Sequence, residues 1–167
     1  MVVLRLVHIF AGIIWVGAGF FMMLVLVPLI KQMGAEGGRF MQRFAAKSRF
    51  GKVMLVTPLL TTLSGLWLYY RVSGHFNSDW MSSSAGVVLG IGSVAGLLAF
   101  GHGAALTGPG FGKMGALARQ IEAQGGPPTE AQMGEMRALG ARNAQHARIS
   151  ALLEIIAVAG MAAARFM

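Results

Sequence analysis

Residues 2–30 read VVLRLVHIFAGIIWVGAGFFMMLVLVPLI and contain only two ionisable side chains, Arg5 and His8. A bilayer core about 30 Å thick is crossed by about 20 apolar residues, each adding about 1.5 Å of helix. The stretch is therefore long enough to span a membrane. It is too long for the hydrophobic region of a signal peptide and lacks a small-residue cleavage site, so we expect a retained first helix.

The composition of the whole chain agrees with this reading. The 167 residues are 55% hydrophobic and 12% charged, with a mean hydropathy of +0.63, whereas soluble domains carry about 25% charged residues. We expect four spans, at about residues 2–30, 53–72, 84–107 and 147–166. The sequence thus predicts an all-α integral membrane four-helix bundle forming a single domain over residues 1–167. The absence of cysteine excludes disulfides, thiolate metal sites and cysteine nucleophiles.

The basic residues predict the orientation. Of the 14 Lys and Arg residues, 11 lie in the connections 31–52 and 107–149. The positive-inside rule therefore places both connections in the cytoplasm and both termini outside, in a bacterial inner membrane. The net charge of +8 follows from this asymmetry, and we expect it to attract anionic lipid of the bilayer rather than nucleic acid.

Both connections carry helix signals. Residues 39–50 place aromatic and aliphatic side chains on one face and basic ones on another, which predicts an amphipathic interfacial helix. Thr129 and Gln132 have capping-box spacing directly after two prolines. We therefore expect a helix that begins at Glu130 and runs into the fourth span.

Ionisable side chains within a membrane are costly and mark functional candidates. They are His8, His102 and Glu154 here, with His146 and Arg148 at the cytoplasmic boundary. Spans one and three run in the same direction, so His8 should lie about 10 Å outward of the midplane and His102 about 10 Å inward. We therefore expect two separate sites, because one metal ion or haem iron could hardly bind both histidines.

Each candidate has a structural alternative. His8 is either a ligand or a neutral imidazole bonded to a neighbouring helix, and its outer neighbours would be Tyr69, Tyr70, Arg71 and His75. His102 is a ligand or a partner of Glu154, and Glu154 pairs with Arg148 or His102 or carries a proton.

Glycine and methionine leave two further alternatives open. The G-x-x-x-G pairs Gly86–Gly90 and Gly92–Gly96 predict close helix packing, whereas Gly12 and its neighbours could make room for a flat macrocycle beside His8. The 12 methionines raise the question of a copper ion, although gap filling in the core is the more common use of methionine.

The spans also carry a family pattern. His8 precedes Trp15 by seven residues, Pro58 and Ser64-Gly65-Leu66 lie in the second span, and Gly101-His102-Gly103 closes the third. Glu154 follows Arg148 early in the fourth span. In this order and spacing, nearly the whole chain resembles the four-helix membrane proteins of the CopD-like and HemJ-type (protoporphyrinogen oxidase-like) superfamily. The resemblance implies a haem b protein with His8 as axial ligand and Trp15 in the same pocket.

The chain departs from the HemJ-type enzymes in the third span. Those enzymes carry a lysine where this sequence has Gly90-Ile91-Gly92, so the resemblance favours a CopD-like relative. Our leading hypothesis is a haem b-binding inner-membrane protein with a redox or electron-transfer role, with His8 as the first ligand and His102 at a second site. The alternatives are a copper-handling or structural subunit without haem and, third, a protoporphyrinogen oxidase-like enzyme. A homodimer or a larger membrane complex is compatible with the glycine-rich third span.

Overall fold

The computed structural model describes residues 1–167, apart from the side chain of Ala35. In chain order the elements are α1 (Val2–Phe21), η1 (Met22–Leu26), α2 (Val27–Gln32), α3 (Ala35–Lys47), α4 (Phe50–Val72), α5 (Ser78–Ser82), α6 (Ser84–His102), η2 (Gly103–Thr107), α7 (Gly108–Ala123), α8 (Glu130–Ala163) and η3 (Ala164–Phe166). Several of these elements are continuous with one another. Four long apolar helices could cross a membrane, at Val2–Gln32, Phe50–Val72, Ser84–Ala123 and Glu130–Phe166. The prediction of an all-α protein with four such helices is confirmed.

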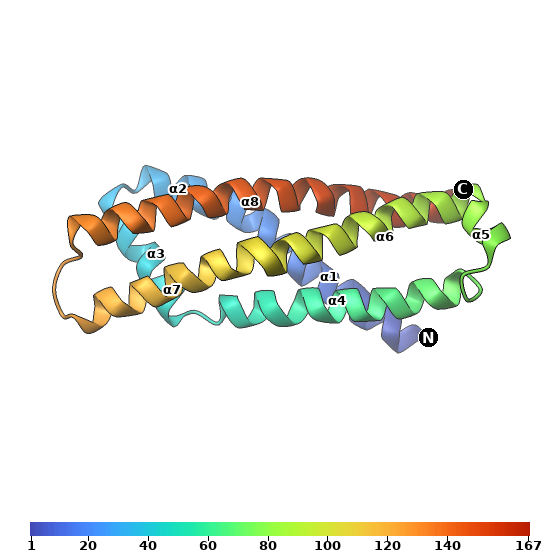
Figure 1. Cartoon of the computed structure of the whole chain (residues 1–167), viewed down its shortest axis with the longest axis horizontal. Coiled ribbons are helices and arrows are strands. Elements are labelled where there is room, and N and C mark those ends of the chain that lie inside the picture. Colours follow the sequence, from blue (N-terminus) through green and yellow to red (C-terminus); the bar gives the residue numbers. More distant parts are fainter.

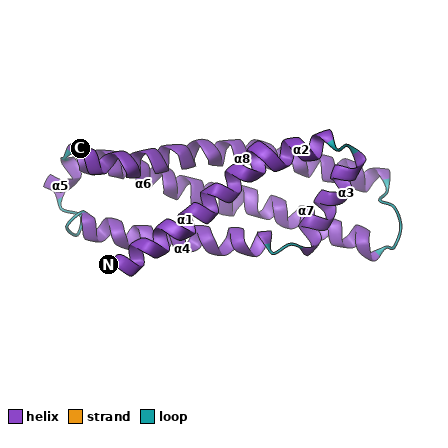
Figure 2. Cartoon of the chain, turned by 180° about the vertical axis from the view of Figure 1, so that it is seen from behind, coloured by secondary structure: helices purple, strands orange, loops and turns teal.

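The long helices lie side by side in an elongated bundle (Figure 1). Both termini and α5 lie at one end of the bundle, which we call the terminal end. Helix α3 and the α7–α8 loop lie at the opposite end (Figures 1 and 2). We call this the basic end, because its connections carry most of the Lys and Arg residues.

Small residues bring α6 and α8 into backbone contact. A Cβ atom added at Gly160 would lie 2.8 Å from the Cα atom of Gly92, and one added at Gly92 would lie 3.0 Å from the carbonyl oxygen of Ala157. Close approach through small residues is a common way to associate helices in membranes. The predicted close packing therefore applies to the Gly92–Gly96 pair, which lies against α8. Helix α1 packs mainly against α4, so the bundle consists of two tightly packed helix pairs.

The outward faces of these helices are apolar, as expected of surfaces that meet lipid. Val3, Leu55 and Leu152 are each more than half exposed. The interior contains mostly small side chains, with Trp15 as a large exception that is 9% exposed.

The third long helix does not end near residue 107, where the sequence analysis places the end of the span. It continues through the π-helical segment η2 into α7 and ends at Ala123. Pro109 lies just after η2, and Pro28 lies just after the other π-helical segment, η1. Proline lacks an N–H group and its ring clashes with the carbonyl four residues earlier. A π-helical turn at that place changes the local hydrogen-bond spacing, so the helix passes the proline without ending.

Of the two helices predicted in the connections, the one beginning at Glu130 forms as expected. The other, α3, begins at Ala35 and ends at Lys47 because Ser48 is extended, so Phe50 of the predicted segment 39–50 belongs to α4 instead. Helix α3 packs against α7, and the Phe44 ring lies 5.3 Å from that of Phe50 between centroids. A capping box begins α8, because Thr129 and Gln132 each accept a hydrogen bond from the other's backbone N–H group. Lys47 of α3 forms an exposed ion pair with Glu122 of α7, at 2.7 Å between Nζ and Oε1. Surface pairs of this kind contribute little stability, about 0–1 kcal/mol, so packing rather than charge holds this end together.

The close α6–α8 approach predicts a specific weakness. We expect Gly160→Ala to destabilise the folded bundle by about 1–3 kcal/mol, the usual cost of overpacking, because the added methyl group meets the backbone of Gly92. The matched control is Gly101→Ala on α6, where an added Cβ has no neighbour within 4 Å among the described residues. Thermal unfolding in detergent, followed by circular dichroism, measures both variants. Equal unfolding temperatures for the two would contradict the packing described above.

Candidate functional site

His8 of α1 bonds to the neighbouring helix α4. Its Nδ1 atom lies 2.8 Å from the carbonyl oxygen of Thr61 and 3.4 Å from the Oγ atom of Ser64. The Ser64 hydroxyl donates to backbone carbonyls of its own helix, which leaves its lone pairs for His8. A carbonyl can only accept, so the proton lies on Nδ1 and neutral His8 has an unprotonated Nε2. No hydrogen-bond partner of Nε2 is found among the described residues.

Glycine at residue 65 makes this contact possible. A Cβ atom added at Gly65 would lie 2.7 Å from the Cε1 atom of His8, closer than real side chains approach. The Ser64-Gly65-Leu66 motif of the second span, noted in the sequence, is therefore where the His8 imidazole of the first span packs. A Cβ atom added at Gly12 would lie 3.6 Å from the Cγ2 atom of Thr61. Gly12 therefore serves helix packing between α1 and α4 at this place.

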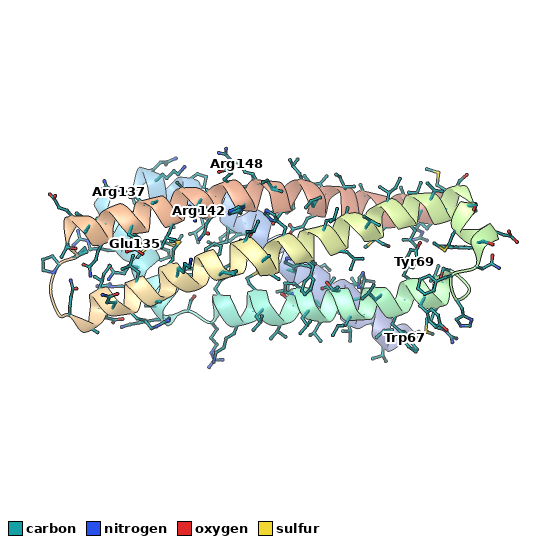
Figure 3. The ribbon with its side chains drawn as sticks, viewed as in Figure 1. Trp67, Tyr69, Glu135, Arg137, Arg142 and Arg148 are labelled. Carbon is teal, nitrogen blue, oxygen red and sulfur yellow. The ribbon has the colours of Figure 1, made fainter. Side chains whose placement is uncertain are left out.

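The inward face of α1 continues from His8 to Trp15 and Gly19. Trp15 is buried in the bundle. The predicted outer neighbours of His8 instead form a separate aromatic group at the terminal end. The Tyr70 and His75 rings are in contact at a tilt, with 4.6 Å between ring centroids, and Tyr69 points from α4 towards α6 (Figure 3).

The two inner histidines come together across α6 and α8. The ring centroids of His102 and His146 lie 5.2 Å apart, and Nδ1 of His102 lies 3.0 Å from the Oγ atom of Ser150. Both histidines are candidates from the sequence, whereas Ser150 is not among the residues predicted there. The signal for Ser150 was the helical spacing of the polar residues of α8, in which it lies four residues after His146 and four before Glu154.

Glu154 is 6% exposed and lies apart from the residues expected to pair with it. Its Oε2 atom lies beside Gly19 of α1, where an added Cβ atom would be 3.5 Å from it. It also lines a cavity of ≈ 280 Å³ together with apolar side chains such as Val16 and Phe20. Arg148 is exposed and points away from the bundle (Figure 3). Among the described residues, neither Arg148 nor His102 forms an ion pair or hydrogen bond with Glu154.

The group around His8 and the group around His102 and His146 lie far apart along the bundle. His8 is six residues from the start of α1 and His102 is eighteen from the start of α6, both counted from the terminal end. This corresponds to roughly 18 Å along the bundle. No group of three or more His, Asp or Glu residues that could hold a metal ion occurs among the described residues. Any metal bound here would therefore rely on one or two imidazoles and on ligands from another molecule.

Comparison with known proteins identifies no relative. The chain matches no family model, no curated protein and no solved structure. The arguments for a function therefore rest on the residues and contacts described above.

The acceptors around Nδ1 predict the tautomer of His8. In protein labelled with nitrogen-15 histidine, we expect solid-state NMR to find neutral His8 protonated at Nδ1 and unprotonated at Nε2. Ser64→Ala should leave this tautomer unchanged, because the Thr61 carbonyl remains. His8→Gln identifies the resonance by its loss. A neutral His8 protonated at Nε2 would rule out the hydrogen bond to Thr61.

Proposed function

We propose that this protein binds haem b in the membrane and has a redox or electron-transfer role, with His8 as the axial ligand. The observation that carries the proposal is the hydrogen bond from Nδ1 of His8 to the Thr61 carbonyl. Metal-ligating histidines usually donate their second ring N–H to a carbonyl or carboxylate, which fixes the ring and increases the basicity of the ligating nitrogen. Within the described residues, Nε2 of His8 has no competing partner.

The surroundings of His8 suit such a ligand in chemistry. When bound, haem would supply a one-electron couple whose potential depends on the axial ligand and on the polarity around it. Thr61 and Ser64 orient the imidazole, and Gly65 allows it to lie against α4. Trp15, on the same helix and buried, would exclude water on the inward side. His102 remains the ligand candidate for a second, separate site.

The observation favouring a protein without haem is that His8 also links α1 to α4 by itself. A hydrogen-bonded imidazole packed on glycine stabilises a helix pair with no ligand present. The alternative function is therefore a structural or copper-handling membrane subunit, in which His102 and His146 are the paired imidazoles available to a copper ion. Protoporphyrinogen oxidase-like activity is the third candidate, and the missing third-span lysine weighs against it.

The four candidate spans make this a multi-pass membrane protein. We propose that it lies in a bacterial inner membrane with the basic end in the cytoplasm and both termini outside. The distribution of Lys and Arg supports this orientation.

The haem proposal predicts a pigment that depends on one residue. Protein purified from haem-replete cells should show a Soret band, with sharp α and β bands on reduction. We expect His8→Ala to lose most of this absorption, because the axial nitrogen is removed. His75→Ala is the matched control and should keep the spectrum, because His75 contacts Tyr70 at the terminal end and not His8. A colourless wild-type protein, or a His8→Ala variant with full haem content, would overturn the proposal.

The orientation is tested with single cysteines, since the chain has none of its own. Ser82→Cys lies on α5 at the terminal end, and Gly126→Cys lies in the α7–α8 loop at the basic end. In intact spheroplasts, a membrane-impermeant maleimide should label Ser82→Cys and leave Gly126→Cys unlabelled until the membrane is permeabilised. The reverse pattern would show that the positive-inside rule fails for this protein.

A further inference from the structure

The polar side chains of α8 lie on one face of the helix. Asn143, His146, Ser150 and Glu154 follow one another at intervals of three or four residues, and residues at such spacing share a face. This face meets α6, η2 and α7, because Ser150 lies beside His102 and an added Cβ at Gly110 would overlap the amide of Asn143. We call this row the polar seam.

Three buried atoms of the polar seam and its facing side lack a hydrogen-bond partner within the described part of the chain. They are Oγ1 of Thr107, Oδ1 of Asn143 and Nδ1 of His146. Asn143 as a whole is only 4% exposed. A buried polar atom left without a partner costs about 1–3 kcal/mol, and such atoms are usually satisfied by ordered water. Their occurrence along one interface indicates that water lies in the polar seam.

The polar seam leads towards Glu154. Ser150 and Glu154 are one helical turn apart on α8, about 6 Å along the axis. The Glu154 carboxyl faces a cavity of ≈ 280 Å³ that is otherwise apolar, and no described residue bonds to it. An ionisable side chain buried within a membrane without an ion-pair partner is a candidate for a proton-carrying role, and Glu154 meets both conditions among the described residues.

We propose that the polar seam is a hydrated path that delivers protons from the basic end to Glu154. In each transfer an O–H bond of a hydronium ion breaks and an O–H bond forms at the Glu154 carboxyl, with no change in oxidation state. The hydroxyl of Ser150 can donate one hydrogen bond and accept another, so it can relay a proton together with water in the polar seam. On the α1 side, the cavity residues Val16 and Phe20 are not titratable. The inference does not depend on haem.

Cysteine reactivity tests whether the polar seam contains water. The variants His146→Cys and Ser150→Cys place a thiol in the polar seam, and Ile149→Cys and Leu152→Cys place one at similar depth on the lipid-facing side, where both residues are exposed. Thiols react as thiolates, which form in water and not in hydrocarbon, so in proteoliposomes we expect at least about tenfold faster reaction of the polar-seam variants with a methanethiosulfonate ammonium reagent. Equal rates for the two pairs would show that the polar seam is dry and would overturn the proposal.

Proton exchange at Glu154 tests where the path ends. The infrared C=O stretch of a protonated Glu154 is identified by its absence in Glu154→Gln, and its shift on transfer to heavy water follows exchange of the bound proton. We expect exchange within the mixing time in the wild-type protein. It should be at least about tenfold slower in Ser150→Val, because the relay loses a hydroxyl beside His102. Leu152→Val is the control on the lipid-facing side.

Two results would contradict this end point. One is the absence of a protonated Glu154 band, and the other is an exchange rate that Ser150→Val leaves unchanged. Neither experiment measures haem, so failure of the path and failure of the proposed function are distinguishable.

Discussion

In a bilayer, each polar group removed from water needs a partner inside the protein, because lipid offers none. The bundle contains two clusters of polar side chains, one around His8 and one along the polar seam, and these clusters meet that requirement differently. Towards the terminal end, His8 satisfies one nitrogen with the Thr61 carbonyl and keeps the other without a partner among the described residues. Towards the basic end, Asn143 and His146 each keep a buried atom without one. The simplest partners for these unbonded atoms are a ligand at Nε2 of His8 and water at Asn143 and His146.

The packing of the bundle explains why the polar seam lies between α6 and α8. Towards the terminal end, Gly92 and Gly160 bring the two backbones into contact and leave no space between them. Towards the basic end, η2 changes the helix geometry before Pro109 and Asn143 fits over Gly110. Close contact at one end and polar residues at the other therefore place the polar seam in the half of the bundle nearer the basic end. Glu154 lies between these two regions.

Much of the fold could be predicted from the sequence, since span length, charge asymmetry and the Thr129–Gln132 capping box are local properties of the chain. The continuation of the third helix past Pro109 could not, because the π-helical segment η2 leaves no compositional signal. The site was predictable only in part. His8, His102 and Glu154 are recognisable as rare ionisable residues, but the partner of His8 is a backbone carbonyl, and no side-chain pattern identifies a carbonyl. Ser150 was missed because a lone serine is common in membrane helices.

The α1 helix connects the two polar groups. Its inward face presents His8 to α4, then buried Trp15, then Gly19 to Glu154. From His8 to Gly19 is 11 residues, or about 16 Å along the helix. A redox centre held by His8 would thus be separated from the Glu154 carboxyl by about this distance, with a tryptophan between them. Electrostatic interaction is stronger in a medium of low polarity than in water, so the negative charge of an electron gained at a centre held by His8 would favour proton uptake at Glu154. This arrangement would couple electron and proton uptake without direct contact between the two groups.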